Sequence, residues 1–185
     1  MEIVLKIAGR AVEGLDRAAP VVLPLLARIV FAGVLLVYFW ASAQTKLGSG
    51  ALGLSDGAYI QIFPRSAEAF GYDFSRFTLL HALVVFAGTW AEFILPLLIV
   101  IGLATRLAAL GMIGFVLVQS FVDVTGHGVG GDDLGAWFDR ASGALIIDQR
   151  SLWVLLLLIL VAMGGGALSL DRIIRRRLGR QTQGS

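Results

Sequence analysis

The chain contains no cysteine, and this absence excludes several kinds of chemistry at once. Without thiols, the protein forms no disulfides, holds no thiolate zinc or iron–sulfur site and has no thiolate nucleophile. If the protein serves a redox system, its own side chains supply no thiol chemistry, and a redox centre has to come from another molecule.

Charged residues are also scarce. Only 15% of the 185 residues are charged, whereas 57% are hydrophobic, and the mean hydropathy is +0.84. One small soluble domain cannot bury so much apolar surface, so the composition predicts a membrane protein surrounded by the lipid bilayer. The net charge of +2 does not indicate a nucleic acid partner, because the basic residues flank apolar segments.

Four apolar segments predict an all-α membrane protein with four transmembrane helices in an up-and-down bundle, forming a single domain over residues 1–185. The segments cover about 21–43, 78–103, 107–124 and 152–170. The second and third are separated by three residues, Ala104 to Arg106, which predicts an antiparallel helical hairpin. Gly164 to Gly166 permit a close helix approach or a local break in the fourth.

The first apolar segment could be a cleaved signal peptide or a retained membrane span. Ala41-Ser42-Ala43 fits a signal-peptidase site, but the apolar run before it is longer than a signal peptide requires and contains Arg28, so a retained span is predicted. Residues 1–19 place apolar side chains at helical spacing between charged ones, which predicts an amphipathic helix lying in the membrane interface. Pro20 and Pro24 are expected to turn the chain and open the first span.

The loop after the first segment begins with the glycine-rich stretch 48–57 and continues with several aromatic residues. Such aromatics suit a segment folded onto the membrane interface. We expect a short interfacial or re-entrant helix at about 58–70 that covers the outer end of the bundle, as a lid or as a packed loop.

The basic residues predict the orientation. With four spans, the side that holds both termini carries nine lysines and arginines: Lys6, Arg10, Arg17, Arg106, Arg172, Arg175, Arg176, Arg177 and Arg180. The opposite side carries five: Lys46, Arg65, Arg76, Arg140 and Arg150. This excess predicts both termini in the cytoplasm and a basic cytoplasmic tail over 171–185. Asp171 is expected to meet Arg106 or Arg172 there.

Ionisable residues inside spans usually face the bundle interior and mark functional sites. Arg28 and Glu92 are predicted to lie at depths that differ by about 6 Å, within the reach of an arginine, so they are expected to pair. Two interpretations stay open: a structural ion pair that holds helix register, or a site for a polar headgroup such as a quinone ring or an anion. Trp90 and Lys46 complete this predicted ligand-binding set.

A second polar group is predicted at the outer mouth of the bundle. Gln119, Asp123 and His127 follow one another at helical spacing and share a face if the helix continues past them; His81, Asp132 and Asp133 lie near enough in the predicted topology to join them. Carboxylate and imidazole also suit a divalent metal, but the surrounding glycines make the geometry unpredictable. The sequence therefore assigns no metal site and no catalytic residue.

Three motifs resemble the DoxX family of four-helix bacterial membrane proteins, over about 25–171. They are Arg28 with Gly33 and Lys46-Leu47, then Glu92 followed by Gly102-Leu103-Ala104-Thr105-Arg106-Leu107-Ala108-Ala109, and finally Gly166-Ala167-Leu168-Ser169-Leu170-Asp171. The resemblance implies a multi-pass protein of the bacterial inner membrane. Several DoxX relatives are associated with sulfur and thiol oxidation, as in the small membrane subunit of thiosulfate:quinone oxidoreductase, and others accompany oxidative-stress or metal-handling proteins.

The resemblance thus implies a membrane subunit of a redox, thiol-oxidation or stress-response system, with a protein partner in a membrane or periplasmic complex and quinone as the candidate ligand. It leaves open whether the chain is itself an enzyme. The alternative is a non-enzymatic role as a membrane scaffold, a small transporter or a metal-handling accessory protein.

Overall fold

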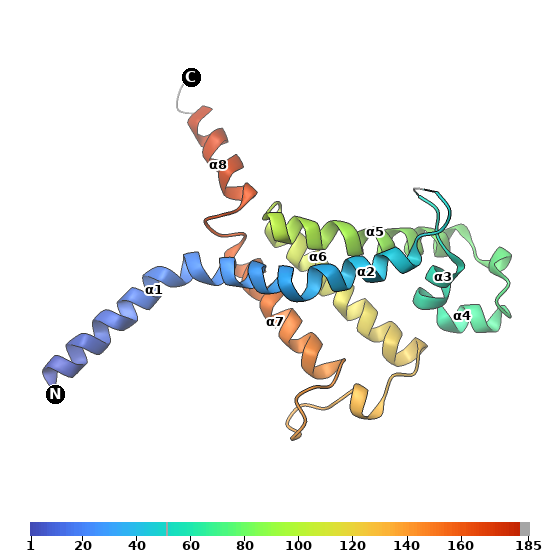
Figure 1. The fold of residues 1–185 in the computed structure, drawn as a ribbon, viewed down its shortest axis with the longest axis horizontal. Helices are drawn as coiled ribbons and strands as arrows, with labels where there is room; N and C mark the ends of the chain where they lie inside the picture. The colour runs from blue at the N-terminus through green and yellow to red at the C-terminus, as the bar shows by residue number, and fades with distance from the viewer. Residues whose placement is uncertain (51, 182–185) are drawn as a thin grey trace.

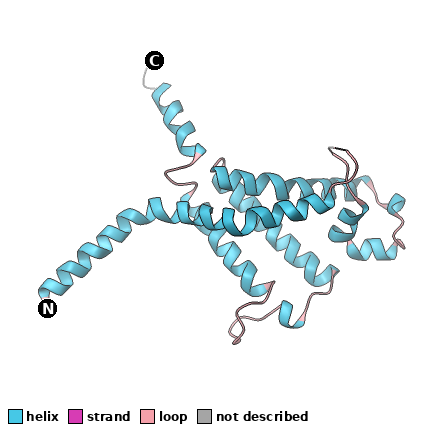
Figure 2. Cartoon of the chain, in the orientation of Figure 1, coloured by secondary structure: helices cyan, strands magenta, loops and turns pink. Residues whose placement is uncertain are grey.

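A computed structural model of the chain describes residues 1–50 and 52–181, with side chains described as far as residue 177. Residue 51 of the predicted glycine-rich stretch, residues 182–185 of the predicted basic tail and the side chain of Arg180 lie outside the described residues. Within the described part the regular structure is helical and contains no β-strand (Figure 2). The helices are α1 (Glu2–Phe31), α2 (Val37–Lys46), α3 (Asp56–Ile62), α4 (Pro64–Ala69), α5 (Leu79–Ile101), α6 (Thr105–Phe121), α7 (Ile147–Met163) and α8 (Leu170–Gln181).

Helices α1 and α2 form one continuous helical rod over Glu2–Lys46, joined by the π-helical segment Ala32–Leu36. The expected turn at Pro20 and Pro24 is therefore no break between two helices, because both prolines lie inside α1. A proline inside a helix loses one backbone hydrogen bond and its ring displaces the preceding turn, which bends a helix without ending it when the flanking turns persist. Figure 1 shows α1 changing direction between its N-terminal half and the part that joins α2.

Three helical segments are long and apolar enough to cross a membrane: Glu2–Lys46, Leu79–Ile101 and Thr105–Gly126. The last two form the antiparallel hairpin that their short connection predicts. The turn between them needs left-handed backbone at Gly102 (φ +72°), where a Cβ atom would also lie 2.6 Å from that of Ser169. The chain is thus a multi-pass helical membrane protein.

Helix α7 has 17 residues and packs against α1 and α6. It begins five residues before the predicted fourth segment and ends seven residues before that segment does. The early end lies at Gly164, whose φ of +75° leaves the helical region, so the glycine triplet acts as a break. Helix α8 then leaves the bundle at a steep angle to α5 (Figure 1).

The loop after α2 folds into two short helices, α3 and α4, in place of the single helix expected at about 58–70. The break lies at Phe63, because Pro64 starts a new helix at a position where its missing N–H is harmless. Helix α3 packs against α2 and α5 and covers one end of the bundle. We call this end the α3 end, and the opposite end, where α8 begins, the α8 end (Figure 1).

Buried apolar side chains from α1, α2, α5, α6 and α7 form the core between the long helices. They include Phe31, Phe39, Ile99, Met112, Leu157 and Leu160, all fully buried. The outward faces of these helices carry exposed leucines, valines and isoleucines, as expected of side chains that contact lipid. The hydrophobic interior therefore fixes helix packing, and the few buried polar groups stand out against it.

Candidate functional site

A cavity of about 460 Å³ lies beside α5 and α6, next to the α3 end of α2. Its walls are mostly apolar, and several of the residues that line it have small side chains or none: Ala87, Gly88, Ala91, Gly111 and Gly114. Small residues at this helix contact leave the volume that larger side chains would fill. Polar side chains line the cavity in two places.

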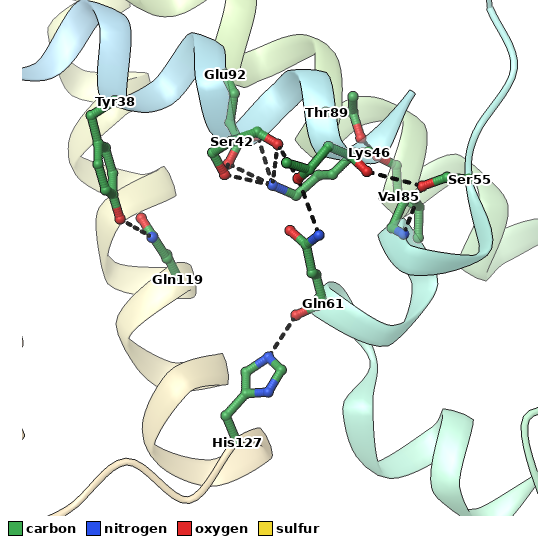
Figure 3. A network of polar contacts seen from close by, with 12 residues as sticks. Tyr38, Ser42, Lys46, Ser55, Gln61, Val85, Thr89, Glu92, Gln119 and His127 are labelled. Carbon is green, nitrogen blue, oxygen red and sulfur yellow. Dashed lines mark hydrogen bonds and ion pairs between the residues drawn. The ribbon is translucent and has the colours of Figure 1, made fainter. Parts of the chain in front are cut away.

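The first polar place is a buried ion pair between α2 and α5. The Lys46 ammonium donates to both Glu92 carboxylate oxygens, at 3.1 and 2.9 Å, and the two side chains are only 7% and 3% exposed. Ser42 completes the group, because its hydroxyl donates to Glu92 at 3.1 Å and accepts from Lys46 at 2.8 Å. Figure 3 shows the three side chains converging from the two helices.

Local sequence places these groups. Ser42 precedes Lys46 by four residues, so both lie on one face of α2 at its last turn, while Glu92 lies one turn before Pro96 in α5. In a low-dielectric interior a charge is tolerated only when it is paired and its remaining hydrogen-bonding capacity is used, and this trio meets both conditions.

The second polar place is at the α3 end of α6. Helix α6 continues through the π-helical segment Val122–Gly126, so Gln119, Asp123 and His127 all line the cavity, as the spacing predicts. The Gln119 amide donates to the Tyr38 hydroxyl at 3.1 Å, while its buried carbonyl oxygen has no partner within the described part of the chain. His127 contacts the backbone carbonyl of Gln61 in α3 at 3.0 Å, which ties the α3 cover to α6 (Figure 3).

Asp123 is not free to bind a metal, because it forms an ion pair at 2.5 Å with Arg150 from the first turn of α7. The same arginine donates to the Ser120 hydroxyl at 3.0 Å. Among the described residues, no group of three or more His, Asp and Glu side chains is placed to hold a metal ion. The open metal alternative therefore gains no geometric support.

The expected pairing of Arg28 with Glu92 is wrong. Arg28 donates to four backbone carbonyls instead: those of Ile99 and Val100 at the end of α5, at 3.1 and 2.6 Å, and those of Gly165 and Leu168, at 3.0 and 2.6 Å. Arg28 thus lies level with Ile99, seven residues beyond Glu92, which corresponds to about 10 Å along the helix. The last carbonyls of a helix lack N–H donors from the next turn, and here the Arg28 guanidinium donates to those of Ile99 and Val100.

Two further predicted residues lie away from the cavity. Trp90 packs at a tilt against Phe86 and Phe93 on another face of α5, and its buried indole N–H has no hydrogen-bond partner among the described residues. His81 contacts the Thr78 hydroxyl at 2.8 Å and packs among aromatic rings at the start of α5. Of the predicted ligand-binding residues, the structure brings Lys46 and Glu92 together at the cavity and leaves Arg28 and Trp90 outside it.

Asp171 is tied to a helix terminus and not to Arg106 or Arg172. Its carboxylate accepts from the backbone N–H groups of Ala104 and Thr105, at 2.7 and 2.9 Å, and from the Thr105 hydroxyl at 2.8 Å. Burial raises the pKa of the Asp171 carboxyl, but these hydrogen bonds and the charge of Arg175 outweigh burial and hold the pKa below its usual value. Asp171 therefore caps the start of α6 as an anion.

Sequence reasoning missed Ser42 and Arg150 as partners. The signal for Ser42 was its position one helical turn before Lys46, on the same face. The signal for Arg150 was a single positive charge at the start of an apolar helix, opposite an acidic helix end. Neither signal names a partner, because the partner lies on another helix.

Side chains that line the cavity also reach the outer surface of α5 and α6. Val84 and Val118 are 43% and 63% exposed there. In a membrane this surface faces the acyl chains, so the cavity borders the lipid phase. The arrangement suits an amphipathic molecule whose polar head enters the cavity and whose apolar part remains in the bilayer.

Comparison with known proteins finds a family for the chain. A family model described as DoxX matches residues 23–125, more than half of the chain. The matched segment contains both cavity helices, the ion pair and Asp123, and it ends before His127 and α7. No curated protein and no solved structure was found to match the chain.

Proposed function

The chain belongs to the DoxX family of membrane proteins, and from this premise we propose that it is the membrane subunit of a redox or thiol-oxidation system that binds a quinone-like ligand. One observation carries the proposal: the buried Lys46–Glu92 pair lines a cavity that borders the lipid phase. A lipid-soluble molecule with a polar ring reaches such a site without crossing water.

The polar groups suit both redox forms of a quinone. A quinone carbonyl accepts hydrogen bonds, and the donors of Lys46 and Ser42 at the cavity wall, which are directed to Glu92, exchange that acceptor for the ligand. A quinol hydroxyl donates, and the buried carbonyl oxygen of Gln119, which accepts from no described residue, is an acceptor at the same cavity. The apolar remainder of the wall matches the ring methyl groups and the first part of an isoprenoid tail.

The chain's own chemistry in this proposal is protonic. Interconversion of quinone and quinol moves two electrons and two protons, and Glu92 and His127 are groups of the cavity that bind or release protons. No side chain of the cysteine-free sequence supplies a thiol or a thiolate-bound redox centre for the electrons. A partner protein in the membrane or the periplasm therefore has to donate or accept them.

The proposal includes a topology with α7 as a fourth membrane span. A helix of 17 residues is about 25 Å long, close to the thickness of the hydrocarbon layer, and α7 packs along α1 and α6. Four spans place both termini on one side, where the larger number of basic residues favours the cytoplasm of a bacterial inner membrane. The cavity and the α3 end then face the outer leaflet.

Native mass spectrometry of the protein, extracted mildly with its own lipids, tests the ligand. We expect the wild-type protein to retain quinone and Glu92→Gln to retain at least tenfold less. Asp73→Asn is the matched control, because Asp73 is an exposed carboxylate hydrogen-bonded to Ser75 in a loop outside the cavity. This control should retain as much quinone as the wild type.

A second variant separates a lost site from a lost fold. The double variant Lys46→Met/Glu92→Leu removes both charges together, which leaves no unpaired charge behind and preserves stability. We expect it to fold and to retain no quinone. If the wild-type protein carries only phospholipid, the redox proposal fails and the ion pair is structural, as the scaffold alternative requires.

A further inference from the structure

Helix α8 has two chemically distinct sides. Leu170, Ile173 and Ile174 follow helical spacing on one side, which Arg177 ends one turn later, and the two isoleucines are 49% and 44% exposed. Arg172, Arg175 and Arg176 follow the same spacing on the opposite side. A helix with one apolar and one cationic side is typical of a segment lying in a membrane interface.

The three arginines line a hollow of about 390 Å³ together with Met163 and Gly166. None of the described residues that line it is acidic. Asp171, the nearest carboxylate in the sequence, directs both oxygens to the start of α6. The positive charge in the hollow is therefore compensated by no lining residue.

The position of α8 adds a geometric argument. Six residues separate it from the end of α7, and it projects from the α8 end of the bundle at a steep angle to α5 (Figure 1). Since α5 crosses the membrane, such a helix follows the membrane surface. Its arginines then lie at the depth of lipid phosphates, and its isoleucines at the depth of the first acyl carbons.

We propose that this hollow is a binding site for the phosphate headgroup of an anionic phospholipid. Arginine guanidinium groups match phosphate geometry and form charge-assisted hydrogen bonds. A lipid is favoured over a soluble phosphate because Met163 offers an apolar contact within the hollow, and because the exposed isoleucines on the opposite side of α8 hold the helix at the acyl layer. This site is separate from the cavity between α5 and α6 and does not depend on the ligand bound there.

The test uses delipidated full-length protein in detergent, titrated with phosphatidylglycerol or phosphatidylcholine and read by native mass spectrometry. We expect the wild-type protein to bind phosphatidylglycerol more tightly than phosphatidylcholine. The variant Arg172→Gln/Arg175→Gln/Arg176→Gln should lose this preference, with phosphatidylglycerol bound about 100-fold more weakly, since each basic residue near an anionic surface contributes about fivefold.

The matched control is Lys6→Gln/Arg10→Gln/Arg17→Gln, which removes the same charge from the N-terminal half of α1, where Arg17 is already paired with Glu13. This control should keep the lipid preference. Equal losses in both triple variants would show a general charge effect and overturn the site. Displacement of the lipid by an equal concentration of inorganic phosphate would overturn the assignment to a lipid headgroup.

Discussion

Charged side chains at the two ends of the bundle bind different kinds of partner. At the α8 end, Arg28 is saturated by four backbone carbonyls and Asp171 by backbone and hydroxyl donors of α6. Toward the α3 end, Lys46 and Glu92 bind each other and Ser42 next to open volume. Charged side chains that bind helix ends have no hydrogen-bonding capacity left for a ligand. In contrast, either member of a side-chain pair beside a cavity can replace its partner with a ligand.

Arg28 and Asp171 therefore hold the chain together at the α8 end, and we call this arrangement the clasp. Arg28 binds the end of α5 and the glycine-rich turn after α7, while Asp171 binds the start of α6 and donates its own N–H to the carbonyl of Gly102 at 2.9 Å. This clasp gathers three chain segments that are far apart in the sequence. Its loss should affect stability before it affects any ligand.

The largest effect is expected from Arg28→Leu. This change removes the side-chain donor from four backbone carbonyls, of which Ile99 keeps the N–H of Gly102, and we expect the free energy of unfolding to fall by about 4 kcal/mol. Arg28→Lys keeps the charge but cannot reach all four acceptors, so an intermediate loss of about 2 kcal/mol is expected. Denaturant titration in micelles, followed by circular dichroism, measures both. Arg28→Leu within 1 kcal/mol of the wild type would contradict the clasp.

The Lys46–Glu92 pair should show strong coupling. Either Lys46→Met or Glu92→Leu alone leaves one buried charge unpaired, and we expect each to destabilise the protein by about 3 kcal/mol. The double variant should lie within about 1 kcal/mol of the wild type, because both charges are gone. A double-mutant cycle on the same unfolding measurement checks this. Additive single losses would mean that the two side chains do not depend on each other.

The cavity can be narrowed without disturbing the pair. Gly114 lines the cavity and has no neighbouring atom within 4 Å of a built Cβ, so Gly114→Leu fits and adds helix propensity. We expect it to weaken quinone binding about tenfold, a change of about 1.4 kcal/mol. Gly33→Leu is the control, since Gly33 also has open surroundings but lies outside the cavity lining. Equal affinity in both variants would argue against binding between α5 and α6.

The smallest effect is expected from Asp171→Asn, which weakens the cap of α6 by about 1 kcal/mol at neutral pH. The folded carboxyl has a lowered pKa, so its stabilisation is present above the unfolded value of about 3.9 and is lost as pH falls through the lower folded value. The gap in stability between the wild type and the variant should therefore close below about pH 4. A gap independent of pH would mean that the carboxylate charge is irrelevant to the cap.

Residues within one helix were predictable, because helical spacing relates them directly. Gln119, Asp123 and His127 share the cavity as their spacing indicates. Partners on different helices were not predictable. The expected Arg28–Glu92 pair does not form, because Arg28 lies level with the end of α5 and not with Glu92. Its actual partners are backbone carbonyls, which have no signature in the sequence.

The sequence by itself determined the membrane environment, the apolar helices, the absence of thiol chemistry and the family, because all four depend on composition, length and local motifs. Only the tertiary structure decided which buried charges meet and where the cavity lies. Both depend on the rotation of each helix about its axis and on its shift along that axis. Rotation and shift are set by the packing of core side chains from different helices, such as Phe39, Met112 and Leu157. That packing brings Lys46 to Glu92 and leaves space beside them.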